Sequence, residues 1–154
     1  MLTFQDMVRT CSSCGRDNRI PAARLDARAR CAACKTPILP VDEPLAVTSV
    51  EDFDELLRDS PLPVVVDFWA DWCGPCHAVA PELKKVASTL AGRVVVAKVD
   101  TEALQQVAGR FGIRSIPTMI RFDKGQETKR VSGAQTASAL SAALGLTAPS
   151  GSSM

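Results

Sequence analysis

The sequence predicts an α/β domain with a mixed central sheet flanked by helices, preceded by a small module held by four cysteines. From Leu45 onward, short apolar runs alternate with amphipathic stretches, which is typical of α/β chains. Before Leu45, large apolar residues are scarce and two C-x-x-C pairs stand 16 residues apart. A length of 154 residues leaves room for one domain of about 100 residues plus a small appendage.

The composition excludes several classes of protein. Hydrophobic residues make up 46% and charged residues 23% of the chain, which excludes wholesale disorder, collagen and coiled coils. The longest apolar runs, such as Pro63–Val66 and Val94–Ala97, are too short to cross a bilayer as helices. Met1–Thr10 lacks the pattern of an export signal. We therefore expect a soluble, cytoplasmic protein with no membrane contact.

Charge is distributed unevenly along the chain. Residues 1–40 carry seven Lys/Arg and three Asp/Glu, whereas residues 41–154 carry eleven and fourteen. A basic patch is one signature of nucleic-acid binding, but no aromatic residue is interleaved with these arginines. A small module with few apolar residues has a charged surface in any case, so we expect no nucleic-acid partner.

Local patterns predict the first elements of the larger domain. Leu45–Thr48 reads as a short strand. Ser49 with Asp52 resembles a capping box, with Asp in place of Glu, and opens a helix over Glu51–Asp59. Val64–Trp69 is almost continuously apolar, which predicts a central strand covered on both faces.

The middle of the domain continues the alternation. A helix is predicted from Gly74 to Leu90, with a kink at Pro81 because proline cannot donate the helical hydrogen bond. Val94–Val99 is predicted as a second central strand. Thr101 is predicted to cap a helix that ends near Arg110.

The last elements complete the sheet. Thr118–Phe122 is predicted as a strand, Asp123–Gln126 as a hairpin turn, and Glu127–Ser132 as its antiparallel partner. Ala134–Leu144 is predicted as the terminal helix. The order β-α-β-α-β-α-β-β-α indicates a mixed sheet in a sandwich three layers deep.

Three segments lie outside these elements. Met1–Thr10 is predicted to be a loose lead-in, within which Met7 is an alternative start of translation. Residues 37–44, PILPVDEP, carry three prolines and are predicted to form a short, semi-stiff linker. The predicted division is a zinc-binding module over 1–36, a linker over 37–44, the larger domain over 45–146 and a disordered tail over 147–154.

Cys11, Cys14, Cys31 and Cys34 form the pattern C-x2-C-x16-C-x2-C. In a chain without an export signal, such pairs indicate metal or redox chemistry rather than a disulfide framework. Two tight knuckles present four thiolates, which suits tetrahedral zinc, and a structural zinc contributes on the order of 10 kcal/mol to a segment without a core. Two local disulfides, four free thiols and an iron–sulfur cluster are the alternatives. With no fifth donor nearby, we expect a structural zinc.

Cys73 and Cys76 form a third pair between a buried strand and a helix. At a helix N-terminus, unpaired amides and the helix dipole favour the thiolate of Cys73. Gly74 and Pro75 shape the first turn, where the missing N–H of proline needs no partner. Cys76, one turn in, is expected to be more covered. Cys73 is therefore expected to attack a substrate disulfide and Cys76 to resolve the mixed disulfide; a permanent disulfide or half of a metal site is the structural alternative.

The segment Val66–Cys76, VDFWADWCGPC, resembles the active-site segment of thioredoxins almost residue for residue. The resemblance extends over about residues 45–146 and includes Pro81, Val96–Asp100 and the segment FGIRSIPT at Phe111–Thr118. The four-cysteine module before it resembles that of the zinc-containing bacterial thioredoxin 2 type. The resemblance implies a thioredoxin fold with an N-terminal zinc-ribbon-like module, and the activity of a protein-disulfide reductase.

The resemblance also implies roles around the dithiol. Asp67, an acid within an apolar strand where burial raises a carboxyl pKa, matches the acid that manages the proton of Cys76. Lys98 matches the lysine that pairs with this acid; a structural buried acid and an ordinary strand-edge lysine are the alternatives. Ile116 and Pro117 match the cis peptide beside the dithiol. There, the backbone of Ile116 pairs with a substrate strand, and Pro117 keeps metal ions off the thiolates.

Other positions near the dithiol have a less specific interpretation. Trp69 is expected in the core and Trp72 at a surface against which substrate lies. Gly133 matches a glycine that lets substrate approach, or is a plain turn glycine. His77 stands where Lys or Arg is frequent, and its imidazole stabilises a thiolate less than a fixed cation does. The negative charge of Asp71 nearby also disfavours the thiolate. The redox potential is therefore not predicted, although a reducing enzyme is expected.

The resemblance further implies one structural zinc ion, no directly bound NADPH or flavin, and a monomer. Electrons would come from an NADPH-dependent thioredoxin reductase and pass to disulfide-containing protein substrates. Cys73–His77 also spells the c-type haem attachment pattern C-x-x-C-H, against which the strand context and the missing export signal stand. A zinc-controlled binding or holdase module is the non-enzymatic alternative. Oxidation of the zinc cysteines that releases metal and retunes the larger domain is a further hypothesis.

Overall fold

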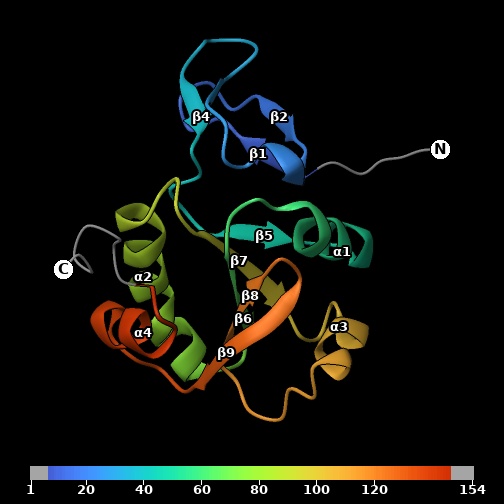
Figure 1. Cartoon of the computed structure of the whole chain (residues 1–154), viewed down its shortest axis with the longest axis vertical. Helices are drawn as coiled ribbons and strands as arrows, with labels where there is room; N and C mark the ends of the chain where they lie inside the picture. Colours follow the sequence, from blue (N-terminus) through green and yellow to red (C-terminus); the bar gives the residue numbers. More distant parts are fainter. Residues whose placement is uncertain (1–6, 147–154) are drawn as a thin grey trace.

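A five-stranded mixed sheet organises the larger part of the chain, in the order β5-β7-β6-β8-β9 (Figure 1). Its strands are β5 (Leu45–Val47), β6 (Val64–Trp69), β7 (Val95–Asp100), β8 (Thr118–Asp123) and β9 (Gln126–Ser132). Strands β5, β7 and β6 are parallel, and β8 and β9 join antiparallel. The structure, a computed structural model, describes residues 7–146. It confirms the predicted element order and the mixed sheet.

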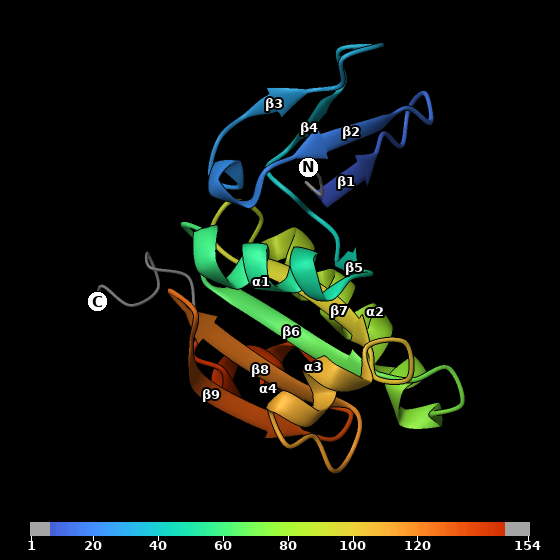
Figure 2. The ribbon, with the colours of Figure 1, turned by 90° about the vertical axis from the view of Figure 1, so that its right-hand side faces the viewer.

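Helices cover both faces of this sheet, which confirms the three predicted layers (Figure 2). They are α1 (Val50–Asp59), α2 (Gly74–Thr89), α3 (Gln105–Arg110) and α4 (Ala137–Ala143). The alternation along β6 divides the core, because Val64, Val66 and Phe68 pack with α1 and α3. Val65 faces α2 and α4 on the other side. Asp67 has the same parity as Val65, so it lies on the α2 face of the sheet.

Two helix starts test the predicted caps. The Ser49 side chain accepts a hydrogen bond from the backbone N–H of Asp52, which confirms the cap of α1. The cap predicted at Thr101 is wrong, because α3 begins only at Gln105. The Asp100 carboxylate accepts hydrogen bonds from the backbone N–H groups of Glu102 and Ala103 and holds a turn there. The Thr101 hydroxyl instead donates to the carbonyl of Trp69.

The small module consists of two antiparallel hairpins joined by a 3-10 turn. Its elements are β1 (Met7–Thr10), β2 (Asp17–Ile20), η1 (Ala22–Arg24), β3 (Ala29–Arg30) and β4 (Pro37–Leu39). The end of the expected lead-in forms β1 and pairs with β2, because its backbone groups satisfy those of the second strand. The expected linker over 37–44 likewise begins as β4, paired with β3. The predicted domain limits themselves stay a prediction.

The module shares its hydrophobic core with the larger domain. Ile20, Leu25 and Leu39 are buried in the same cluster as Phe53 and Leu56 of α1. The backbone N–H that opens η1 donates to the carboxylate of Glu55 on α1 at 3.0 Å. Figure 2 shows the turn of the module resting on α1. With so few large apolar residues, the module uses the surface of α1 to complete its core.

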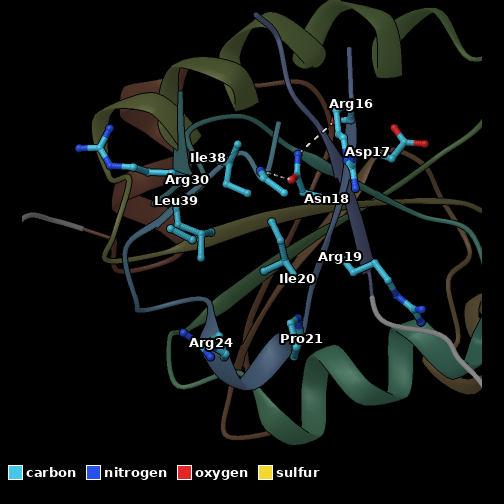
Figure 3. A pocket seen from close by; sticks show the side chains of 12 residues that line it. Arg16, Asp17, Asn18, Arg19, Ile20, Pro21, Arg24, Arg30, Ile38 and Leu39 are labelled. Atoms are coloured by element: carbon cyan, nitrogen blue, oxygen red, sulfur yellow. Dashed lines mark hydrogen bonds between the residues drawn. The ribbon is translucent and has the colours of Figure 1, made fainter. Parts of the chain in front are cut away.

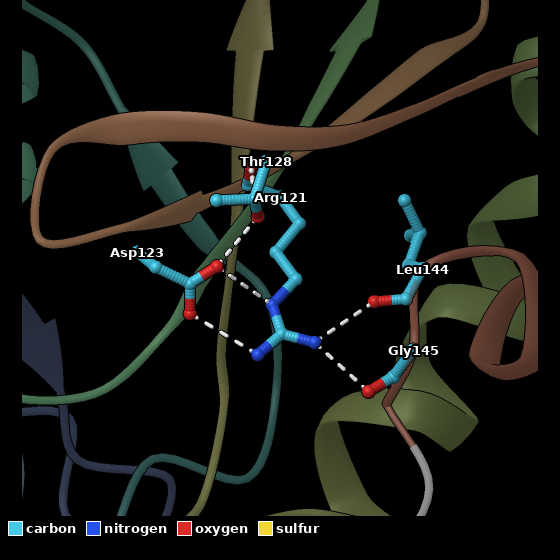
Figure 4. Close-up of polar contacts among 5 residues, drawn as sticks. All are labelled: Arg121, Asp123, Thr128, Leu144 and Gly145. Atoms are coloured by element: carbon cyan, nitrogen blue, oxygen red, sulfur yellow. Dashed lines mark hydrogen bonds and ion pairs between the residues drawn. The ribbon is translucent and has the colours of Figure 1, made fainter.

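An arginine network fastens the far end of the chain. The Arg121 guanidinium binds the Asp123 carboxylate and donates to the carbonyl oxygens of Leu144 and Gly145 at 3.0 and 2.8 Å (Figure 4). Residues 1–6 and the tail predicted over 147–154 lie outside the described residues. Between residues 7 and 146, no helix combines the length and the apolar character that crossing a membrane requires.

Candidate active site and metal centre

Cys73 occupies the N-cap position of α2, where the chain turns from β6 into the helix. In this structure Cys73 and Cys76 are joined by a disulfide, with their Cα atoms 5.2 Å apart. The backbone N–H of Cys76 donates to Sγ of Cys73 at 3.2 Å, and Pro75 lies in the first turn. An amide and the positive end of the helix dipole therefore face the sulfur of Cys73, as the sequence predicts.

Cys73 and Cys76 differ in burial less than expected. Cys73 is 4% exposed and Cys76 is 3% exposed, so coverage distinguishes them by very little. Their positions relative to the helix differ more clearly. Cys73 precedes the first turn and receives the amide, whereas Cys76 lies inside the helix. The different chemical roles expected of the two sulfurs therefore depend on helix position rather than on coverage.

An exposed tryptophan stands beside the disulfide. Trp72 is 70% exposed, and its indole Nε1 donates to the carboxylate of Glu102 at 2.7 Å. Glu102 follows β7 and is 30 residues away in sequence, so no local pattern indicated this contact. Trp69, expected in the core, is only half-buried. Tryptophan, whose ring is apolar and whose N–H is polar, is enriched at interfaces.

The peptide before β8 lies next to the disulfide. The Ile116–Pro117 peptide bond is cis, as the resemblance implies. Sγ of Cys73 lies 3.7 Å from the carbonyl oxygen of Ile116. The N–H of Gly133 donates to the carbonyl of Pro117 at 2.8 Å. Gly133 has φ +95°, and a Cβ there would meet no atom within 4 Å, so the space above it is open. The start of α2 and the cis peptide thus meet at one sulfur, and Gly133 is bonded to that peptide.

Asp67 is a buried acid on the same face of the sheet as α2. It is 1% exposed, and neither carboxylate oxygen has a hydrogen-bond partner. Burial raises the pKa of Asp67 to about 7, and the positive charge of Lys98 opposes this rise. Lys98 lies opposite Asp67 in the β6–β7 register, but its Nζ sits 4.6 Å from the centre of the Trp69 ring. Lys98 therefore acts on Asp67 through its charge rather than through a hydrogen-bonded ion pair.

Asp67 lines a cavity of about 200 Å³ together with residues of other elements. Besides Asp67, it is lined by Glu43, Pro44, Ala80, Leu83, Lys84 and Lys98. Sequence reasoning missed Glu43 and Lys84. Both belong to segments that pack against β6 only in the folded chain. The cavity thus brings Glu43, Lys84 and the buried acid around one space.

The His77 side chain is bonded to Asp71. Its Nε2 lies 2.6 Å from the backbone oxygen of Asp71 and 4.0 Å from the carboxylate of that residue. The His77 side chain is 57% exposed, so solvent screens its influence on the sulfurs.

The four cysteines of the small module converge on one point. Their sulfur atoms all lie within 4.8 Å of one another, and Cys11–Cys34 and Cys14–Cys31 are each 3.6 Å apart. Four sulfurs around a tetrahedral zinc, each at about 2.3 Å, are about 3.8 Å from one another. The donor set and its spacing therefore fit a zinc ion.

Two equivalent knuckles present these sulfurs. In the first, the N–H of Cys11 donates to the carbonyl of Arg16, and that of Gly15 donates to the carbonyl of Cys11. The second knuckle repeats both bonds around Cys31. Gly15 and Lys35 follow the second cysteine of each knuckle with φ +80° and +69°. This left-handed residue closes each turn around its pair of sulfurs.

A buried asparagine joins the two knuckles. Asn18 is 7% exposed; its side chain donates to the carbonyl of Arg16 and accepts from the N–H of Ala32. Sequence reasoning missed this residue. Backbone hydrogen bonds, with that of Cys34 the strongest, lower the pKa of Cys31 to about 6, whereas hydrogen bonds with the sulfurs of Cys31 and Cys34 raise the pKa of Cys14 to about 11. A lowered pKa favours the thiolate, which is the form that binds metal.

A wider cavity of about 460 Å³ lies on the module alone, between its hairpins (Figure 3). Ile20, Ile38 and Leu39 line it together with arginines that include Arg16 and Arg30. All its lining residues fall between 16 and 39, so it has no wall in common with the surroundings of the disulfide.

Both parts of the chain resemble known proteins. Residues 44–145 match the family model described as Thioredoxin, and residues 10–36 match the one described as Thioredoxin 2, N-terminal. Thioredoxin C-3 of Corynebacterium nephridii is 41% identical over 128 residues, covering 83% of this chain and 86% of the relative. The bifunctional thioredoxin reductase/thioredoxin of Mycobacterium leprae is 45% identical over 96 residues, covering 62% of this chain and 21% of that protein. The thioredoxin structure from Malassezia sympodialis superposes with a TM-score of 0.59 at 38% identity, covering 66% of this chain and 87% of that one.

Proposed function

The chain belongs to the thioredoxin family and carries the N-terminal zinc ribbon of the thioredoxin 2 type, and from this premise we propose that it reduces protein disulfides with Cys73 as nucleophile and Cys76 as resolving thiol. The fold is the thioredoxin fold, and the family is one of thiol-disulfide oxidoreductases. The observation that carries the proposal is the Cys73–Cys76 disulfide at the N-terminus of α2, beside the cis peptide before β8.

The first exchange uses the surface around Cys73. An extended substrate segment pairs with the backbone of Ile116, over the open space at Gly133, and rests against Trp72. The Cys73 thiolate attacks one sulfur of the substrate disulfide. A new Cys73–substrate S–S bond forms, the substrate S–S bond breaks, and the other substrate sulfur leaves with the bonding electron pair. The amide at the start of α2 stabilises the attacking thiolate.

The second exchange uses the buried acid. Cys76 transfers its proton to Asp67 and attacks the Cys73 sulfur, so that the Cys73–Cys76 bond forms and the mixed disulfide breaks. The second substrate thiolate leaves, and the protein is then in the oxidised form of this structure. Because the pKa of Asp67 is about 7, this carboxyl can both accept and release a proton near neutral pH. Lys98 keeps that pKa from rising further.

The four-cysteine cluster would hold one structural zinc ion. When bound, zinc supplies a crosslink between the two knuckles and no open coordination position. Its four ligands are Cys11, Cys14, Cys31 and Cys34. The close approach of these sulfurs supports zinc over two separate disulfides within the knuckles, since the closest pairs join one knuckle to the other.

The remaining parts of the proposal concern partners and location. Thioredoxin reductase would re-reduce the disulfide, which the M. leprae relative supports because its name joins both activities in one protein. The chain itself would bind neither NADPH nor flavin, would act on disulfide-containing proteins and would need no nucleic acid. We place it as a monomer in the cytoplasm, where free thiols persist, with the domain limits at 1–36, 37–44 and 45–146.

An insulin reduction assay with thioredoxin reductase and NADPH tests this function, with zinc quantified in the same preparation. We expect turnover by the wild-type protein and none by Cys73→Ser, with about one zinc per chain in both. If Cys73→Ser keeps the activity of the wild type, the chain is not a reductase. If the wild type and the double variant Cys73→Ser/Cys76→Ser both only suppress the aggregation of a client protein, the chain is a binding module.

A further inference from the structure

The cavity at Asp67 has a second carboxylate at its outer end. Glu43, in the segment between β4 and β5, lines the same cavity of about 200 Å³ as Asp67. The Glu43 side chain is 50% exposed, whereas Asp67 is 1% exposed. The cavity volume has room for several water molecules. A buried acid and a half-exposed acid therefore line one small cavity.

An arginine of the small module holds Glu43. Nη2 of Arg9, on β1, lies 3.5 Å from Oε2 of Glu43 and 2.9 Å from Oδ1 of Asp42. The Arg9 side chain is only 11% exposed. Arg9 is thus a largely buried, permanent cation that forms ion pairs with the more exposed Asp42 and Glu43. The first hairpin of the zinc module consequently sets where Glu43 stands.

The charges around the cavity come from three other elements. Lys84 faces it from α2 and Lys98 from β7, while Asp67 comes from β6. The two lysines balance the two carboxylates. A proton can therefore reside on either acid without leaving a large uncompensated charge in the cavity.

We propose that Glu43 carries protons between Asp67 and solvent during the resolving step, and that Arg9 positions Glu43 for this task. The proposal rests on the proposed function. As Cys76 attacks, the Cys73–Cys76 bond forms and the substrate sulfur leaves with the electron pair of the mixed disulfide. The Cys76 proton goes to Asp67, passes through cavity water to the Glu43 carboxylate, and leaves to solvent. Re-reduction runs the same transfers in reverse. Glu43 thus links the zinc module to the chemistry of the dithiol.

The first test is kinetic. Pre-reduced protein is mixed with a disulfide peptide at saturating concentration, where resolution of the mixed disulfide limits the single turnover. We expect Glu43→Gln to slow this step about three- to tenfold at pH 7, with the peptide concentration for half-maximal rate unchanged. Formate or acetate is expected to restore the rate, because a small acid can replace the missing proton carrier. A merely structural role of Glu43 would show no such rescue.

Asp42→Asn is the matched control. It removes the same charge from the adjacent residue, which contacts the same arginine but does not line the cavity. We expect its rate to equal that of the wild type. The proposal is overturned if Glu43→Gln keeps the wild-type rate, if formate and acetate fail to rescue it, or if Asp42→Asn loses as much as Glu43→Gln.

The second test follows Asp67 directly by NMR titration of its carboxyl carbon in the oxidised protein. Removal of the Glu43 charge leaves Asp67 facing two lysines, so Glu43→Gln should lower the pKa of Asp67 by about half a pH unit. Asp42→Asn should leave it in place. An unchanged Asp67 pKa in Glu43→Gln would overturn the proposed coupling of the two acids, whatever the activity shows.

A double-mutant cycle tests the part played by Arg9. Arg9→Met should slow resolution in the same sense as Glu43→Gln but less, and the double variant should be no slower than Glu43→Gln alone. Zinc content and thermal unfolding verify that Arg9→Met is folded. Additive losses would show that Arg9 does not act through Glu43. If wild type and Cys73→Ser are equally inactive, the proposed function fails and this proposal with it; if only Cys73→Ser is inactive while Glu43→Gln behaves as wild type, this proposal alone fails.

Discussion

The metal cluster and the redox pair use the same C-x-x-C spacing in opposite ways. In the small module, a left-handed residue after the second cysteine closes each knuckle, and two knuckles bring four sulfurs within 4.8 Å. At α2, the chain continues into a helix after Cys73, and two sulfurs remain alone beside a cis peptide. Both arrangements point amides at sulfur. What the chain does after the pair therefore decides between a closed metal site and a reactive dithiol.

The largest effects are expected when one sulfur is removed from each of the two sites. Cys73→Ser removes the nucleophile, so insulin reduction should fall to background while zinc content stays at about one per chain. Cys11→Ser removes one of four metal ligands, so zinc should be lost while the disulfide exchange of Cys73 and Cys76 persists. Activity and zinc measured on both variants check this reciprocity, and a loss of activity in Cys11→Ser as deep as in Cys73→Ser would contradict the separation of roles.

Metal removal should destabilise the module before it affects the dithiol. A strong chelator under reducing conditions is expected to lower the free energy of unfolding by several kcal/mol, because the metal is the main crosslink of a module without its own core. Calorimetry with and without chelator measures the effect. Identical unfolding curves would mean that the hairpins are held by the shared core alone.

The buried acid of the dithiol side predicts a dependence of stability on pH. The folded-state pKa of Asp67 is raised to about 7 from 3.8, so the folded oxidised protein binds a proton more tightly than the unfolded chain between these values. Stability should therefore fall as pH rises from about 4 to 7, by roughly 4 kcal/mol in all. Asp67→Asn should abolish this fall and unfold at higher urea than the wild type at pH 8. Parallel curves for both proteins from pH 4 to 8 would contradict the raised pKa.

A smaller effect is expected at the joint between the knuckles. Asn18→Ala leaves the N–H of Ala32 and the carbonyl of Arg16 without this side-chain partner, which should cost about 1 kcal/mol. Zinc affinity should weaken with it, while the rate of insulin reduction stays unchanged. Urea unfolding and a competitive zinc chelator measure the two quantities. An unchanged zinc affinity would show that the knuckles approach one another without Asn18.

Local sequence patterns predicted most of the fold and both cysteine sites. Apolar runs and caps act between neighbours in sequence, so the element order and the cap at Ser49 could be predicted. The cap at Thr101 could not, because Asp100 competes for the same amides. Glu102 beneath Trp72 and Glu43 beside Asp67 also escaped prediction. These contacts join segments 20 or more residues apart, so no local sequence pattern indicates them.

The core shared between the small module and α1 has a consequence for any attempt to cut the two apart. Phe53 also packs edge-on against Phe111 and Phe122, so α1 has further core contacts within the larger domain. Leu25 and Leu39 lie buried in the same cluster as Phe53 and Leu56. A fragment that ends before α1 is therefore expected to expose these leucines to water and to aggregate.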